Sequence, residues 1–168
     1  MAQNRGKQFE SVIKEAFEKV DGVSIDRLHD QTTGFKGSQN ICDFVVYKKP
    51  YEYYVECKSV HGNTLPFSNI TDTQWKGLLE KSKIPGVFAG IICWFVDKNV
   101  TYYFDIQFLY ALKTQGYKSV RYDSKVDSYP PNYADDSELF QLSGKKKRVF
   151  FDYDMNQFFG DLSNADYN

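Results

Sequence analysis

Asp43, Glu56 and Lys58 are the residues whose types and spacing could perform chemistry. If the two carboxylates lie opposite each other in neighbouring strands, their Cβ atoms are about 5 Å apart and their charges repel. Lys58 follows Glu56 by two residues, so it lies on the same face, roughly 7 Å along the strand. Two repelling carboxylates with a lysine beside them match the needs of a divalent metal site that also stabilises charge in a reaction.

A hairpin must bring these side chains together. Apolar and polar residues alternate with a period of two on both sides of 48–51, which predicts two half-buried strands joined by a four-residue loop. This register pairs Val46 with Tyr53 and Phe44 with Val55, and it places Asp43 opposite Glu56.

A solvated sheet face with ordinary cross-strand ion pairs would show the same three residues. Two further residues favour a site. Gln74 falls in the first turn of a helix expected from about 71 to 83, and Glu10 borders the apolar stripe of a helix expected from Asn4, its N-cap, to Val20. Glu10 could reach the edge of the sheet, although a merely exposed helical acid fits the pattern equally well.

The remaining elements follow from hydrophobic periodicity and capping residues. The almost wholly apolar stretch 86–96 predicts a central strand that is covered on both faces. The other expected elements are a strand over 23–28, polar loops over 29–40 and 59–68, a strand over 100–104 antiparallel to 86–96, a helix capped by Asp105 and closed by Gly116, a long loop over 123–136, a short strand over 149–151 and a last helix capped by Asp154.

Composition indicates one packed domain. The chain has 168 residues, of which 42% are hydrophobic and 17% aromatic, so we expect a single domain over 1–168 with a core over about 4–116 and an extension over about 117–168. Three cysteines without CxxC spacing are typical of reduced, buried thiols. No apolar run reaches membrane-spanning length and no leader is visible, so we expect a cytoplasmic protein without membrane contact.

The charge pattern limits how nucleic acid could be held. The net charge is −1, so any DNA-binding surface must be local. Candidate phosphate contacts are Arg5 and Lys7 at the start of the first helix and Lys36 between two glycines in the loop 29–40. The basic run Lys145–Arg148 is a further local candidate, although such runs are usually just solvated.

The order of these motifs resembles the PD-(D/E)xK nuclease superfamily. Within it, the chain is most similar to RecU-like Holliday junction resolvases, which Gram-positive bacteria and their phages carry. The likeness covers about residues 4–110, and no motif follows Tyr117. The segments that carry it are Asn4-Arg5-Gly6 with Glu10, Asp43-Phe44, Glu56-Cys57-Lys58, and Phe67-Ser68-Asn69-Ile70 followed by Gln74.

The resemblance implies a role for each of these residues. Asp43 and Glu56 would hold Mg²⁺, for which Mn²⁺ can substitute, with the backbone carbonyl of Cys57 as a further ligand. Glu10 would complete the acidic pocket, directly or through water. Lys58 would orient the attacking water and offset phosphate charge, and Gln74 would help to position it. Hard oxygen ligands suit these cations, and such cations assist phosphodiester hydrolysis.

Two departures from the resolvase pattern stand out. Cys42 precedes the aspartate where the resolvases have threonine. The segment 26–41, which corresponds to the protruding stalk that enters the junction in the resolvases, is short. The second departure counts against a preference for junctions.

The sequence therefore predicts an α/β protein with a restriction-endonuclease-like core, in which a mixed β-sheet is flanked by α-helices. The expected function is a Mg²⁺-dependent endodeoxyribonuclease that resolves four-way DNA junctions as a homodimer, because symmetric cutting needs two active sites. One alternative is another nuclease on the same core, a nickase or a restriction-type enzyme. The other is a non-catalytic DNA-binding or phage structural factor that retains the fold.

Overall fold

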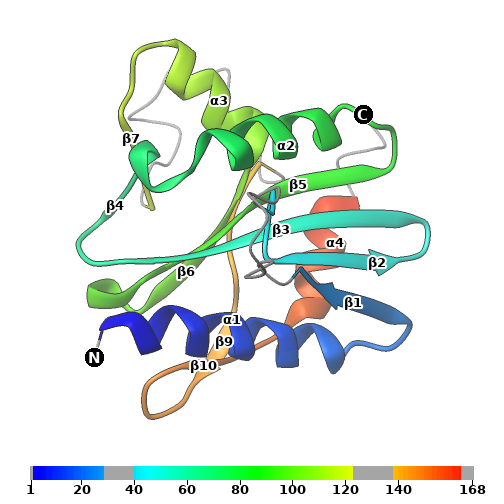
Figure 1. The fold of residues 1–168 in the computed structure, drawn as a ribbon. Helices are drawn as coiled ribbons and strands as arrows, with labels where there is room; N and C mark the ends of the chain where they lie inside the picture. The colour runs from blue at the N-terminus through cyan, green and yellow to red at the C-terminus, as the bar shows by residue number, and fades with distance from the viewer. Residues whose placement is uncertain (1, 29–39, 123–137, 164–168) are drawn as a thin grey trace, which may run out of the picture.

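A computed structural model describes residues 2–28, 40–122 and 138–163 (Figure 1). Its helices and strands, in chain order, are α1 (Ala2–Glu18), β1 (Val23–Arg27), β2 (Phe44–Lys48), β3 (Tyr51–Val60), β4 (Thr64–Pro66), the 3₁₀ turn η1 (Phe67–Asn69), α2 (Asp72–Ser82), β5 (Val87–Phe95), the 3₁₀ turn η2 (Val96–Lys98), β6 (Val100–Asp105), α3 (Ile106–Thr114), β7 (Ser119–Arg121), β8 (Leu139–Gln141), β9 (Gly144–Lys146), β10 (Phe151–Tyr153) and α4 (Met155–Ser163).

A six-stranded sheet organises the described residues. Its order is β1-β2-β3-β5-β6-β8, and β3 and β5 run parallel while every other neighbouring pair is antiparallel. Figure 1 shows α2 and α3 together on one side of the sheet and α1 on the other. The predicted α/β class, with a mixed sheet flanked by helices, is confirmed.

Two apolar clusters fill the two sides of the sheet. One joins α1, α4 and β10 to the sheet through residues such as Phe9, Phe17 and Phe158. The other joins α2 and α3 to the sheet through residues such as Leu78 and Leu109. Strand β5 contributes to both clusters because its successive side chains alternate between the faces. The expectation of a central strand that is buried on both faces is confirmed.

The hairpin of β2 and β3 has the predicted register. Phe44 pairs with Val55 and Val46 with Tyr53. The connection is tighter than expected, because Lys48 already pairs with Tyr51 and only two residues form the turn. Pairing thus extends one residue further on each strand, which leaves both faces of the hairpin unchanged.

Two other expectations about element boundaries are wrong. Helix α1 begins at Ala2, so Asn4 lies inside the helix instead of capping it; alanine and glutamine are good helix formers and extend it. The stretch 59–68 is not simply a loop. Strand β3 continues to Val60 because it pairs with β5, and β4 pairs with β7. Both pairings join segments far apart in the chain, which local patterns do not reveal.

The C-terminal part also differs in detail from expectation. The late strand covers Phe151–Tyr153 instead of 149–151, because Phe151 pairs with Lys146 of β9. Strand β8 extends the main sheet beside β6, and α4 begins after Asp154, whose Oδ1 accepts the Asn156 N–H as expected of a cap. The loop over 123–136 and most of the loop over 29–40 lie outside the described residues.

Candidate active site

The candidate site lies where β2 begins beside the middle of β3. Asp43 immediately precedes β2, and its backbone N–H donates to the carbonyl of Val55 (3.1 Å), the residue that pairs with Phe44 in the hairpin. Its Oδ2 accepts the backbone N–H of Cys57 (2.8 Å). Asp43 is therefore held against β3 by two hydrogen bonds, next to Glu56.

Strand alternation directs Glu56 and Lys58 to the face that α2 covers. Cys57, between them, packs in the opposite cluster with Phe9 of α1. Glu56 is only 5% exposed, which is unusual for a carboxylate, and Nζ of Lys58 lies 2.8 Å from its Oε1. The pair is buried in the fold and does not form a solvated face.

Gln74 connects this ion pair to the start of α2. Its Nε2 donates to Oε1 of Glu56 (2.7 Å), and its Oε1 lies 3.3 Å from Nζ of Lys58. The same Oε1 accepts the backbone N–H of Thr71 (3.0 Å), while Oγ1 of Thr71 accepts the Gln74 N–H (3.2 Å). This reciprocal capping box holds the glutamine side chain in place. Gln74 thus caps α2 and contacts the candidate site at the same time.

Burial sets the electrostatics of the two carboxyl groups. Desolvation, and then the neighbouring Glu56 charge, raise the pKa of Asp43 to about 7, against the opposing effects of the Cys57 N–H and Lys58. Desolvation also raises the pKa of Glu56, while Lys58 and Gln74 lower it and the charge of Glu10 raises it further. The carboxyl groups are thus held close together where their negative charges are poorly compensated.

Glu10 lies on the other side of the sheet, with α1. Its carboxylate forms an ion pair with Arg27 at the end of β1. Its charge still reaches the site, since it contributes to the raised pKa of both Glu56 and Cys57. Glu10 is therefore near enough to the cluster for its charge to raise the pKa of Glu56.

Arg27 is a member of this neighbourhood that the sequence analysis did not identify. It pairs in register with Phe44, and the next residue, Leu28, donates its backbone N–H to the Asp43 carbonyl (2.8 Å). The only feature of the sequence that could have indicated Arg27 is its position near the end of the expected strand 23–28. Only the pairing of β1 with β2 shows that this end lies beside Asp43.

The oxygen donors present would suit a hard divalent cation. Two carboxylates converge here, and the N–H and C=O of one strand residue point to the same edge, so the Cys57 carbonyl faces the edge on which its N–H meets Asp43. Burial raises the pKa of the Cys57 thiol well above its ordinary value, so its side chain offers no thiolate. Within the described part of the chain, no group of three or more histidine, cysteine, aspartate or glutamate side chains is placed to hold a metal ion.

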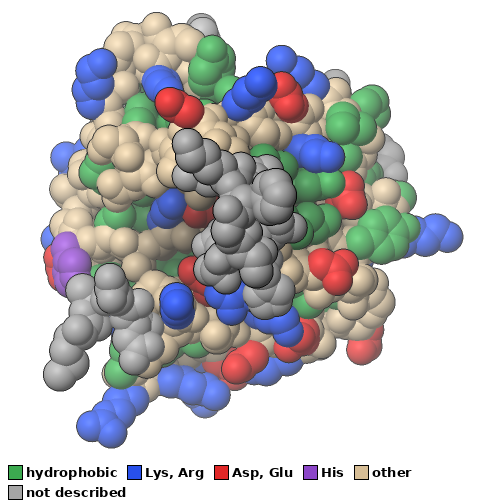
Figure 2. Space-filling view, viewed as in Figure 1, with side chains coloured by type: hydrophobic (Ala, Val, Ile, Leu, Met, Phe, Trp, Pro, Cys, Tyr) green, Lys and Arg blue, Asp and Glu red, His purple; other side chains and the backbone are tan. Residues whose placement is uncertain are grey.

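Two of the three expected phosphate contacts lie on α1. Arg5 and Lys7 are exposed on the first half of α1, and Lys36 lies outside the described residues. Figure 2 shows basic and acidic side chains close together on the surface between α2 above and α1 below. Among the described residues, no helix is long and apolar enough to cross a membrane.

Comparison with known proteins gives a distant similarity to solved structures. No family model matches the chain, and no curated protein matches it. The chain is similar in structure to Hjc, a Holliday junction resolvase from the archaeal hyperthermophile Archaeoglobus fulgidus. The TM-score is 0.42 and the sequence identity 16%, and the similarity covers 62% of this chain and 78% of that one.

Proposed function

We propose that this protein is a metal-dependent nuclease that hydrolyses phosphodiester bonds in DNA. The observation that carries this proposal is the cluster of Asp43, Glu56, Lys58 and Gln74, in which Glu56 is buried and the other three side chains are partly buried. Carboxylates this close together, with raised pKa values and a lysine in direct contact, occur preferentially at functional sites. A merely structural ion pair of Glu56 with Lys58 would not need Asp43, a second carboxyl group, beside it.

In this proposal Asp43 and Glu56 hold Mg²⁺ or Mn²⁺, with the Cys57 carbonyl as a further oxygen ligand and Glu10 as a more distant contributor of negative charge. A divalent cation at such a site supplies Lewis-acid stabilisation of phosphate charge and a more acidic water. Asp43 has a pKa of about 7, so it must give up a proton before it can serve as a ligand at neutral pH.

Lys58 and Gln74 act on the substrate side of this arrangement. The ammonium group of Lys58 offsets negative charge that develops on the phosphate, and its contact with Glu56 keeps it in place. Gln74 orients both Glu56 and Lys58, and the capping box fixes Gln74 in turn. The side chains are therefore positioned before substrate arrives, which reduces the cost of reorganisation during the reaction.

For the substrate, we propose four-way DNA junctions cut by a homodimer, which the likeness of the sequence motifs to RecU-like resolvases supports. Arg5, Lys7 and Lys36 would contact phosphates. The alternatives are a nickase or restriction-type nuclease with the same site, and a DNA-binding or phage factor without catalysis. The cluster favours the catalytic alternatives, because an inert protein gains nothing from two neighbouring carboxylates whose charged forms are disfavoured.

A cleavage assay with Mg²⁺ on a four-way junction, a fork and a linear duplex tests the proposal. Asp43→Asn should abolish cleavage and retain DNA binding, since it removes a charged ligand but little volume. Lys58→Met should slow cleavage by about 10²-fold or more. Lys76→Met, which removes an exposed lysine from the same helix as Gln74, serves as the matched control and should cut at the wild-type rate.

Each alternative has its own signature in this assay. Wild-type cleavage by Asp43→Asn would refute the metal site. Equal wild-type rates on junction and duplex would exclude a resolvase and leave a general nuclease. DNA binding without cleavage in either Mg²⁺ or Mn²⁺ would favour the non-catalytic factor.

A further inference from the structure

The most basic segment of the described chain is a hairpin on the α1 side of the sheet. Strands β9 and β10 pair antiparallel, and Lys145–Arg148 run through β9 into the turn. All four basic side chains are exposed, and the segment 144–153 contains one acidic residue, Asp152. We call this segment the basic hairpin.

The basic hairpin is packed firmly onto the core. Phe150 lies 5.1 Å from Trp94 between ring centroids, and Phe151 stacks on Tyr153 at 5.7 Å. Its turn is closed by the backbone N–H of Lys147, which donates to the Phe150 carbonyl (2.8 Å). The basic side chains therefore project from a defined surface.

Its positive charges are only partly used within the protein. Asp152 binds Lys19 (2.6 Å) and Lys147 (3.6 Å), so its single negative charge is shared between two cations. The side chains of Lys145 and Arg148 make no hydrogen bond or ion pair with the described residues. This local surplus of positive charge stands out in a chain whose net charge is −1.

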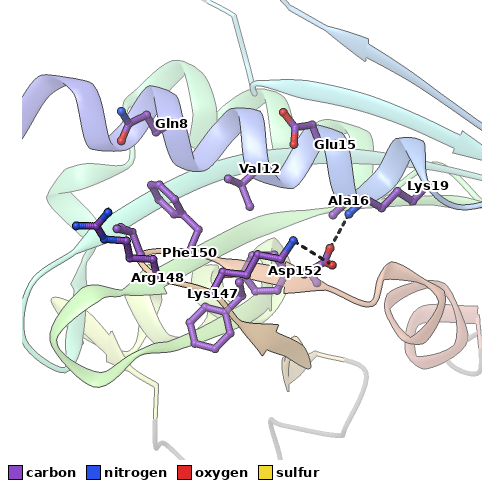
Figure 3. A pocket seen from close by; sticks show the side chains of 12 residues that line it. Gln8, Val12, Glu15, Ala16, Lys19, Lys147, Arg148, Phe150 and Asp152 are labelled. Atoms are coloured by element: carbon purple, nitrogen blue, oxygen red, sulfur yellow. Dashed lines mark hydrogen bonds and ion pairs between the residues drawn. The ribbon is translucent and has the colours of Figure 1, made fainter.

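A groove separates the basic hairpin from α1. It encloses about 410 Å³ and is lined on the α1 side by Gln8, Val12, Glu15, Ala16 and Lys19, so one carboxylate, that of Glu15, also borders it. Figure 3 shows Gln8 and Arg148 towards one end of the groove and the Lys19–Asp152 pair towards the other. The guanidinium group of Arg148 points away from the Lys147–Asp152 pair, so it is available to an external anion.

Helix α1 contacts both β10 of the basic hairpin and β3, the strand that carries Glu56. Gln8 faces the groove. Glu10 lies about 160° from Gln8 around the helix axis, and its charge raises the pKa of Glu56. The exposed Lys7 is within about 60° of Glu10. A helix with its side chains is about 10–12 Å wide, and the major groove of B-form DNA is about 12 Å wide. Phosphates on the two sides of one groove could thus reach both flanks of α1.

We propose that the basic hairpin binds the phosphate backbone of a DNA duplex that lies across α1, with Lys145 and Arg148 contacting one strand and Lys7 the other. The choice of DNA rests on the proposed function. Contacts of this kind hold the duplex without reading its sequence. The basic hairpin thereby fixes how a duplex arm approaches the candidate site.

Duplex binding by the full chain in the presence of a chelator tests this without cleavage. The test variant is Lys145→Gln with Arg148→Gln, since neither side chain makes a contact that the fold needs. The matched control is Lys83→Gln with Lys118→Gln, which removes two exposed charges from the opposite side of the sheet. Fluorescence anisotropy with two unrelated DNA duplexes is measured over a range of salt concentrations.

The test variant should bind both DNA duplexes on the order of tenfold more weakly. The slope of the logarithm of its association constant against the logarithm of salt concentration should be less negative by about 1.8, because two phosphate contacts are lost. The control should match the wild type. The double substitution should weaken binding to an RNA duplex less than binding to DNA, because the major groove of RNA is too narrow and deep for a helix.

Equal affinity and salt slope for the test variant and its control would overturn the inference. So would a loss confined to RNA, or a wild type that binds no duplex. Cleavage by the wild type in Mg²⁺ separates this inference from the proposed function. Hairpin-dependent binding without any cleavage would refute the nuclease alone, whereas cleavage with hairpin-independent binding would refute this inference alone.

Discussion

Asp43 shows how a single partly buried carboxyl group connects the chemistry of the candidate site to the stability of the fold. The pKa of Asp43 is raised from 3.8 to about 7 by burial and by Glu56. The folded protein therefore binds a proton at Asp43 more tightly than the unfolded chain does. The contribution of this proton binding to the free energy of unfolding is complete below about pH 4 and is lost as the pH rises through about 7.

Asp43→Asn should consequently stabilise the metal-free protein in a pH-dependent manner. The gain in the free energy of unfolding should be on the order of a few kcal/mol at pH 8 and near zero at pH 4, because asparagine carries no charge to desolvate. Thermal unfolding in a chelator at both pH values measures it. A variant that is less stable than the wild type at pH 8 would contradict the assigned environment of Asp43. Adding Mg²⁺ at pH 8 should stabilise the wild type more than the variant.

At the scale of elements, the site depends on the close approach of α2 to the chain just before Asp43. A Cβ atom added at Gly77 would collide with the Ile41 side chain. Glycine here therefore allows α2 to lie against residue 41 and brings Gln74 within reach of Glu56. The contact is set by packing between two elements, not by a turn or an unusual backbone angle.

Gly77→Ala should push α2 outward and weaken both stability and activity. Overpacking of this kind costs about 1–3 kcal/mol, which exceeds the gain in helix propensity. The matched control is Gly160→Ala in α4, where an added Cβ meets nothing within 4 Å. It should be neutral or stabilising by up to about 1 kcal/mol. Thermal unfolding and DNA cleavage of both variants provide the comparison. Similar behaviour of the two variants would show that α2 tolerates the displacement.

At the scale of the whole molecule, the C-terminal segment completes the core against which α1 packs. Phe158 of α4 is 1% exposed, and its ring lies 5.2 Å from Phe17, 5.6 Å from Tyr53 and 5.4 Å from Tyr103. These partners come from α1, β3 and β6. We therefore propose that residues 1–168 behave as a single domain, with the C-terminal segment as part of its core.

Phe158→Ala should lower the free energy of unfolding of the whole chain by about 3–5 kcal/mol and leave one cooperative transition. Ile84→Ala serves as the control, because Ile84 is 48% exposed and its truncation should cost no more than about 0.5 kcal/mol. Calorimetry measures both. Two separate transitions, with only one affected by Phe158→Ala, would mean that the C-terminal segment unfolds independently of the rest.

The sequence alone determined those features that arise from local periodicity and capping. The register of the β2–β3 hairpin was predictable because a slip of one residue would turn every apolar side chain to the wrong face. The helix starts near residue 71 and at Asp105 were predictable, because the side-chain oxygens of Thr71 and Asp105 accept hydrogen bonds from N–H groups within three residues. The proximity of Asp43, Glu56 and Lys58 followed from the same local patterns.

Only the tertiary structure decided which distant segments meet. The parallel pairing of β3 with β5, the ion pair of Arg27 with Glu10, the use of Gln74 as both cap and site contact, and the packing of the basic hairpin beside α1 all join residues that are far apart in the chain. A segment's own pattern states that it has an apolar face but not which partner covers that face. The choice depends on the combined burial and hydrogen bonding of all the segments, set against the entropy of closing the loops between them.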